Sequence, residues 1–167
     1  MLSNQPEFNT VRVFNAPLDL VWRAWTEPAL FGRWFGPKGF SSRVKNFDLR
    51  AGGMLHSCLI SQEGHEMWAK FVYREVTPKT RLVWEHSFSD PEGNLTRHPI
   101  SPEWPLKLLT TIVLTDLGDK TQLHLHWTPL DASDAECQVF LAGMDGMHQG
   151  WGGTWEQLDA FLAEEQA

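Results

Sequence analysis

One change in the spacing of the apolar residues limits the folds open to this chain. Between residues 40 and 127, apolar side chains largely alternate with polar ones, as in strands with one buried face. Between residues 132 and 164 they recur every three or four positions, as on one face of a helix. A sheet face and a helix face of this kind bury each other, so the sequence predicts a two-layer α+β domain.

Short segments rich in Gly, Pro or polar residues separate the predicted strands. A strand over residues 8–14 and two short helices over residues 18–27 and 29–35, each preceded by a proline, come first. Six further strands are predicted, over residues 40–50, 52–61, 65–76, 80–88, 106–116 and 121–129. Because the loops are short, except over residues 89–105, we expect one antiparallel sheet of about seven strands that curls around the terminal helix.

The apolar face of the C-terminal segment is interrupted by five glycines, at positions 143, 146, 150, 152 and 153. Each glycine inside a helix costs up to about 1 kcal/mol relative to alanine. Two interpretations stay open. The glycines break or kink the helix, or they let the helix approach the sheet or a ligand closely.

Length and charge narrow the functional classes. The 167 residues have the length of one domain, which we assign to residues 1–167. Lys+Arg 14 against Asp+Glu 21 gives a net charge of −7, and this balance argues against nucleic acid or an anionic membrane surface as a partner. Two cysteines, no apolar run of membrane-spanning length and no leader-like start favour a cytoplasmic protein without a disulfide framework.

Aromatic residues are unusually numerous, with nine Trp and ten Phe beside a single Tyr. The Trp side chain is large and carries one N–H donor, so this many indoles line a large core, an interface or a ligand cavity. Composition alone does not separate these alternatives.

Alternation sorts the side chains of each strand into two faces. In the strand over residues 52–61 the predicted inward residues are Leu55, Ser57 and Leu59. The outward residues of the same strand are Met54, His56 and Cys58. The strand over residues 80–88 has an apolar face with one histidine, made by Leu82, Trp84, His86 and Phe88. In the last strand one face is shared by Leu123, Leu125 and Trp127.

Two histidines on otherwise apolar faces are the candidate polar groups of an interior site. They are His86 and His148, the latter near Met144 and Trp151 at helical spacing. Each is either a hydrogen-bonded core residue or, in a cavity, a group that orients a ligand or transfers a proton. Glu85 falls on the face opposite His86, so these two side chains are not expected to converge.

Signatures of metal or cofactor chemistry are missing from the sequence. His124 and His126 have the spacing of two metal ligands on one strand, but no third ligand accompanies them, so they are expected to point to solvent. No G-x-S-x-G, H-E-x-x-H or phosphate-binding glycine loop occurs. Ser57 and Cys58 have no identifiable base, and Tyr73 is interpreted as a sheet residue. No metal and no cofactor are predicted.

Five short motifs occur in order along the chain: Pro17, residues 34–39 (WFGPKG), residues 48–53 (DLRAGG), residues 73–83 (YREVTPKTRLV) and Gly150-Trp151. With them the chain, from about residue 8 to residue 162, resembles the family related to the activator of the heat-shock-protein-90 ATPase. That family lies within the START-like SRPBCC superfamily, which includes polyketide cyclase and Bet v-like proteins. The resemblance implies a helix-grip fold with a deep apolar cavity between the sheet and the terminal helix.

The resemblance leaves three functions open, because the superfamily includes carriers, lipid-transfer domains, cyclases and co-chaperones. The first is binding of a small hydrophobic or aromatic molecule in the cavity, with a homodimer left open. The second is a cyclase, dehydratase or hydrolase in the same cavity, with His86 or His148 as acid or base. The third is co-chaperone-like stimulation of a heat-shock ATPase. It ranks last because the related co-chaperones carry an additional domain and only about seven residues precede the first strand here.

The expected cavity wall combines inward-facing strand residues, the two aromatic residues before the Gly-Pro segment and the apolar face of the terminal helix. Its members are Trp34, Phe35, Leu55, Ser57, Leu59, Trp68, Trp84, His86, Phe88, Met144, His148 and Trp151.

Overall fold

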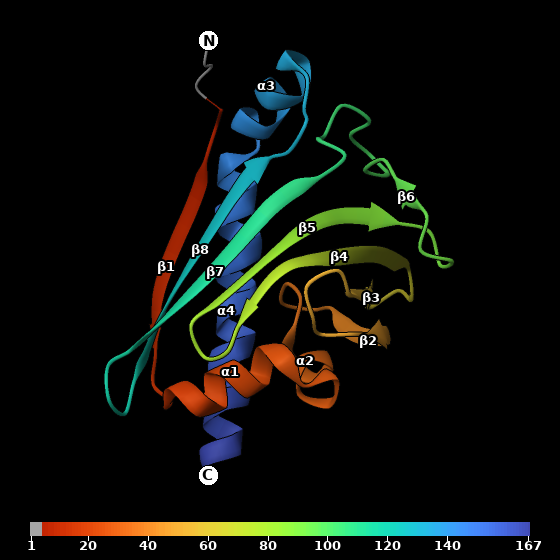
Figure 1. The fold of residues 1–167 in the computed structure, drawn as a ribbon. Helices are drawn as coiled ribbons and strands as arrows, with labels where there is room; N and C mark the ends of the chain where they lie inside the picture. The colour runs from red at the N-terminus through yellow and green to blue at the C-terminus, as the bar shows by residue number, and fades with distance from the viewer. Residues whose placement is uncertain (1–4) are drawn as a thin grey trace.

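A strongly curved antiparallel sheet and one long helix form the two layers of the protein (Figure 1). The computed structural model describes residues 5–167. Its elements are β1 (Phe8–Phe14), α1 (Leu18–Thr26), α2 (Pro28–Trp34), β2 (Ser41–Phe47), β3 (Met54–Ile60), β4 (Glu66–Thr77), β5 (Arg81–Ser89), β6 (Leu95–Thr96), β7 (Leu108–Asp116), β8 (Thr121–Pro129), α3 (Asp134–Ala142) and α4 (Met144–Gln166). The strand order is β1-β8-β7-β5-β4-β3-β2, every pairing is antiparallel, and β6 pairs with β5.

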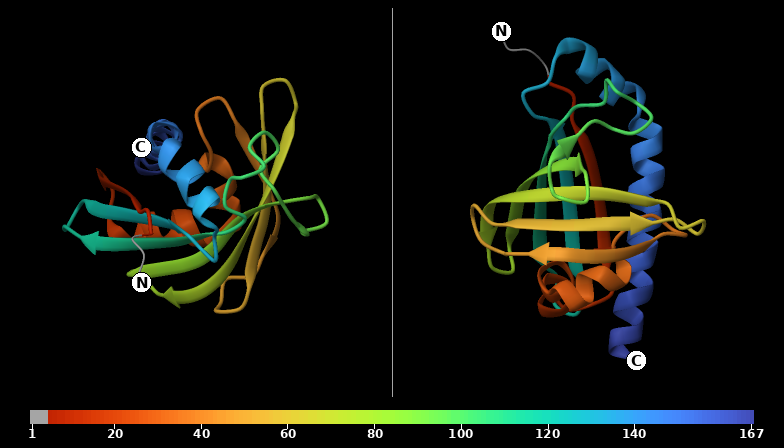
Figure 2. Two further views of the ribbon diagram at one scale, coloured as in Figure 1. Left: turned by 90° about the horizontal axis from the view of Figure 1, so that it is seen from above. Right: turned by 90° about the vertical axis from the view of Figure 1, so that its right-hand side faces the viewer.

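Helix α4 lies in the hollow of the curved sheet, as both views of Figure 2 show. Helices α1 and α2 close one end of this hollow, and α3 lies at the other end (Figure 1). The predicted α+β helix-grip architecture is therefore confirmed. One addition is β6, which falls inside the segment predicted as a loop over residues 89–105. It has only two residues, Leu95–Thr96, too few to produce an alternating pattern.

Two β-bulges bend the half of the sheet that lies opposite α4. The pairing register shifts between Val44 and Asn46 in β2 and between Tyr73 and Glu75 in β4. A bulge adds one unpaired residue to its strand, which bends the strand and increases its twist. The bulges therefore help the sheet to curve around α4.

The C-terminal helical segment bends at Gly143. Ser133 and Glu136 form a capping box that begins α3, and Gly143 separates α3 from α4 with a backbone conformation (φ −93°, ψ 8°) outside the helical range. Figure 1 shows α3 turned away from the axis of α4. The kink interpretation of the glycines is thus confirmed at this position.

The remaining glycines divide into two kinds. A Cβ on Gly153 would lie 3.2 Å from the backbone nitrogen of Lys38, so this glycine permits the close approach of α4 to the segment after α2. A Cβ on Gly146 or Gly150 would have no neighbouring atom within 4 Å. These two glycines border empty space.

Aromatic and aliphatic side chains fill the core beneath that space. Trp34, Leu55 and Trp84 are 1%, 0% and 0% exposed. The Trp34 indole N–H donates to the carbonyl oxygen of Ala24 over 3.0 Å, and the Trp84 ring stacks on Phe71 with 4.6 Å between centroids. Trp34, Leu55 and Trp84, predicted for the cavity wall, are therefore core residues.

The outward residues of β3 are covered as well. His56 and Cys58 are 1% and 0% exposed, because Trp68 and the turn after β5 lie over them. The His56 ring lies 4.8 Å from the Trp68 ring, and its Nε2 is 3.0 Å from Ser89 Oγ. Trp68 is the register partner of Cys58 and shares its face of the sheet. The prediction that Trp68 belongs to the cavity wall is therefore wrong, because Trp68 lies on the convex face.

Candidate functional site

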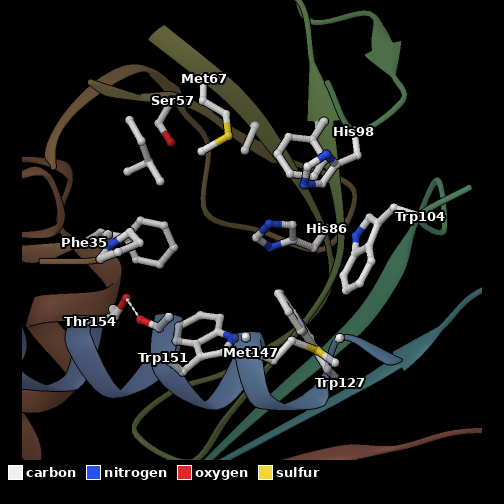
Figure 3. A pocket seen from close by; sticks show the side chains of 18 residues that line it. Phe35, Ser57, Met67, His86, His98, Trp104, Trp127, Met147, Trp151 and Thr154 are labelled. Atoms are coloured by element: carbon white, nitrogen blue, oxygen red, sulfur yellow. Dashed lines mark hydrogen bonds between the residues drawn. The ribbon is translucent and has the colours of Figure 1, made fainter. Parts of the chain in front are cut away.

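A cavity of about 420 Å³ lies between the concave face of the sheet and α4 (Figure 3). Its volume is typical of small-molecule sites. The wall is formed by Phe35, Gly36, Pro37, Ser57, Leu59, Met67, Ala69, His86, Phe88, His98, Trp104, Trp127, Gly143, Gly146, Met147, Gly150, Trp151 and Thr154. Among these wall residues of the described chain there is no Asp, Glu, Lys or Arg.

Three neighbouring strands supply most of the sheet side of the cavity, each with two inward residues, and β8 adds Trp127. The residues of the three strands are Ser57 and Leu59 of β3, Met67 and Ala69 of β4, and His86 and Phe88 of β5. The antiparallel register places them side by side, since Ser57 pairs with Ala69, Leu59 with Met67, and Ala69 with Phe88. Strand alternation and register together thus build this wall.

Helix α4 supplies the opposite side through residues spaced three and four apart, among them Gly146, Gly150 and Thr154. Because the two glycines have no side chains, the helix leaves the space beside them empty. Trp151 lies at this side with its ring 6.1 Å from Phe35 and 5.4 Å from Trp127, both in edge-to-face orientation.

The segment before β7 covers the third side with His98 and Trp104. Arg97 fixes this segment: its guanidinium pairs with Glu136 of α3 and donates to the carbonyl oxygen of Trp104. The Trp104 ring packs on Phe140 of α3 with 5.6 Å between centroids. The segment before β7 is therefore held against α3.

The structure brings part of the predicted set together on the cavity wall: Phe35, Ser57, Leu59, His86, Phe88 and Trp151. Met144 and His148 are not on it. Met144 packs half-buried against the core, and His148 is exposed with its ring 4.7 Å from that of Phe8. His148 is two residues before Gly150, which places it about 200° around the helix from that cavity residue.

Other wall residues were not predicted. Alternation could have found Trp127, which shares a face with buried Leu123 and Leu125. His98 and Trp104 lie in an irregular segment without alternating or helical periodicity, so no sequence signal placed them at the cavity.

The His86 ring projects into the cavity from β5 (Figure 3). Its Nδ1 accepts a hydrogen bond from the Trp84 indole N–H, with 3.4 Å between the nitrogens. The rings of Phe71 and Trp127 lie 4.7 Å and 5.4 Å from it. Burial among these groups lowers the pKa of His86 to about 4, so the imidazole is neutral near pH 7.

His98 is held by the backbone of its own loop. Its Nδ1 accepts hydrogen bonds from the backbone N–H groups of Ile100 and Ser101, over 3.0 Å and 3.1 Å. The His98 ring contacts Phe88 edge-to-face with 4.9 Å between centroids. Burial lowers the pKa of His98 below the ordinary value, so this imidazole also favours its neutral form.

Other titratable groups considered from the sequence lie away from the cavity. Glu85 is on the outer face, where it accepts a hydrogen bond from Arg74 over 2.9 Å. Tyr73 is 3% exposed and is not a wall residue, and burial raises the pKa of its hydroxyl. His86 therefore has neither of these groups as a proton-transfer partner.

The histidine pair of β8 lies on the outer face of the sheet. There the His124 ring contacts the side chain of Asn9 of β1, and the His126 ring contacts that of Glu7, the residue before β1. Within residues 5–167 no group of three or more His, Cys, Asp or Glu side chains could hold a metal ion. Over the same residues, no helix is long and apolar enough to cross a membrane.

A curved antiparallel sheet that grips a long C-terminal helix above an apolar cavity defines a protein of the helix-grip, START-like class. Within this class, the chain belongs to the family of activator of Hsp90 ATPase homolog 1-like proteins, whose family model matches residues 15–163. The family predicted from the sequence motifs is thereby confirmed.

Several solved structures share the fold. A protein from Nitrosomonas europaea is 26% identical, with 99% of each chain covered and a TM-score of 0.73. A protein from Arthrobacter aurescens is 23% identical, with 95% of this chain and 86% of that chain covered and a TM-score of 0.78. The AHSA1 protein from Silicibacter pomeroyi is 17% identical, with 96% of this chain and 99% of that chain covered and a TM-score of 0.70. No curated protein matches the chain.

Proposed function

We propose that the protein binds a small hydrophobic, aromatic molecule in the cavity between the sheet and α4. The observation that carries this proposal is a cavity of about 420 Å³ whose wall is mostly aromatic, aliphatic and glycine residues and has no charged side chain. Moving apolar surface from water into such a site yields about 25 cal/mol per Å². Membership of the family supports the proposal, because its members generally bind hydrophobic ligands.

The shape of the wall favours a flat ligand. Phe35, Trp127 and Trp151 present rings in edge-to-face contact, and an aromatic ligand extends such a cluster with additional favourable contacts. Met67 and Met147 add flexible thioethers that adapt to the outline of a bound molecule.

The same geometry supports binding better than acid/base catalysis. A general base needs a free lone pair directed at the reacting proton. The Nδ1 lone pairs of His86 and His98 already accept hydrogen bonds from protein N–H groups, so the other nitrogen of each neutral ring carries a proton. Neither imidazole therefore offers a basic nitrogen to a molecule in the cavity.

Direct binding tests the proposal. We expect 2-isopropenylnaphthalene to bind with one-to-one stoichiometry in calorimetric titration and to raise the melting temperature, because a ligand specific for the folded state stabilises it. We also expect native mass spectrometry of the purified protein to reveal a bound small molecule. Absence of binding by this probe and by its ketone analogue 2-acetylnaphthalene would contradict the proposal.

His148→Ala is expected to leave the affinity for 2-isopropenylnaphthalene unchanged within about twofold, because exposed substitutions away from a site change free energies by about 0.5 kcal/mol or less. The exposed ring of His148 contacts Phe8 and is not a wall residue. Calorimetric titration of the variant beside the parent protein measures the effect. A tenfold or greater loss of affinity would show that His148 contributes to the binding site.

A further inference from the structure

Two histidines line both the cavity and a smaller neighbouring recess of about 140 Å³. His86 and His98 line both spaces, together with Phe88, Trp104 and Trp127. Figure 3 shows both imidazole rings on the same side of the cavity, opposite Thr154. A ligand that fills the cavity as far as the recess therefore meets both rings.

The surroundings of the two rings fix which nitrogen each presents. The indole N–H of Trp84 donates to His86 Nδ1, and the backbone N–H groups of Ile100 and Ser101 donate to His98 Nδ1. An N–H of either kind can only donate, so the neutral imidazole that accepts it must carry its own proton on Nε2. Both histidines therefore present Nε2–H donors.

The other polar side-chain groups of the wall include the Trp127 indole N–H and the hydroxyls of Ser57 and Thr154. The Trp127 indole N–H is already used, since it donates to Thr110 Oγ1 over 2.6 Å. On the opposite side, the Thr154 hydroxyl donates to the carbonyl oxygen of Gly150 over 2.9 Å. No wall residue of the described chain is a carboxylate. The histidine side of the cavity is thus rich in donors and without charge.

We propose that the ligand is a neutral molecule with a carbonyl-type acceptor, which accepts hydrogen bonds from Nε2–H of His86 and of His98. This inference rests on the proposed function and adds the chemical class of the ligand. A pure hydrocarbon in the same place would displace water from two N–H groups and leave them unpaired, which is unfavourable. A carboxylate would be buried without a cationic side chain among the wall residues, which is also unfavourable.

Three naphthalenes of one size test the inference: 2-acetylnaphthalene, its isostere 2-isopropenylnaphthalene and 2-naphthoate. The ketone is expected to bind about tenfold more tightly than the alkene. This fold-change corresponds to the upper end of the net free energy of one neutral hydrogen bond. The carboxylate is expected to bind more weakly than the ketone at pH 7.5. Calorimetric titration gives the three affinities.

The outcomes separate this inference from the proposed function. Equal affinities for ketone and alkene would overturn the inference and leave a hydrophobic binding site in place. Tighter binding of 2-naphthoate than of the ketone would overturn the proposal that the ligand is neutral. Absence of binding by all three probes would overturn the proposed function and the inference with it.

Variants assign the effect to the two rings. His98→Phe keeps an aromatic ring without an N–H donor, and water can replace the lost acceptor because Ile100 is exposed. His86→Phe keeps an aromatic ring without a donor. In the double variant the ketone-to-alkene affinity ratio is expected to fall to about one. A change in cavity size largely cancels in this ratio, because the ketone and the alkene have the same size. His124→Gln, on the outer face, is the matched control and should keep the parent ratio.

Nitrogen-15 spectra of the histidine rings give a readout that is independent of any ligand. His86 and His98 are expected as neutral Nε2–H tautomers at pH 7.5. Neutral Nδ1–H rings would overturn the inference, as would an unchanged affinity ratio in the double variant.

Discussion

The double variant Gly146→Leu/Gly150→Leu is expected to bind 2-isopropenylnaphthalene about tenfold to a hundredfold more weakly, because overfilling a packed space costs about 1–3 kcal/mol. The cavity exists partly because α4 has no side chains at these two positions, where an added Cβ would meet no atom within 4 Å. Leucine side chains there extend into the volume that the ligand needs. Calorimetric titration measures the loss.

The double variant should lose this binding without losing stability. Replacing a helical glycine by a residue with a side chain raises the free energy of unfolding by about 0.5–1 kcal/mol where space permits. Gly152→Leu is the matched control, because Gly152 is also in α4 and also has no atom within 4 Å of an added Cβ, but is not on the cavity wall. The control should retain parent affinity. Parent affinity in a folded double variant would show that the probe binds elsewhere.

The fold could be predicted because its signals are periodic. Alternation gave the strands and their inward faces, and the spacing of three and four gave the terminal helix. The same rules placed Ser57, Leu59, His86 and Phe88 on the wall where the structure has them. In β4 the same alternation, counted from buried Phe71, puts Trp68 on the outer face beside Cys58, its register partner.

Alternation gives the face of a residue but not its depth. Leu55 shares a face with Ser57, and Trp84 shares one with His86, yet Leu55 and Trp84 lie in the filled core. The two members of each pair differ in their position along the strand, because α1 and α2 close one end of the sheet (Figure 1). This difference depends on how helices distant in the sequence cover the sheet, and a single strand pattern does not contain it.

The remaining part of the site depends on a segment without periodicity. His98 reaches the cavity because Arg97 pairs with Glu136 and because Ile100 and Ser101 fix the imidazole through their backbone. These contacts join residues up to 39 positions apart. No local pattern specifies them, so the second histidine of the candidate site became visible only in the structure.

The stability of the protein is expected to fall by about 3 kcal/mol through His86 alone as the pH drops from 6.5 to 4, at about 1.36 kcal/mol per pKa unit. Burial lowers the pKa of His86 to about 4, from the ordinary 6.5. In the unfolded chain the ring takes up a proton below pH 6.5, whereas the folded protein keeps it neutral down to about pH 4. Protons therefore favour the unfolded state across this interval, and above pH 6.5 the contribution is constant.

Urea unfolding of the parent chain and of His86→Phe between pH 7.5 and pH 4 measures this effect. The variant is less stable throughout, because the Trp84 N–H loses its acceptor, but its stability should decline less steeply toward low pH. Other groups that titrate in this range, including His98 beside the cavity, contribute to both proteins and cancel in the difference. Parallel curves for the parent and His86→Phe would mean that water in the cavity solvates the imidazolium, and that His86 titrates near its ordinary pKa.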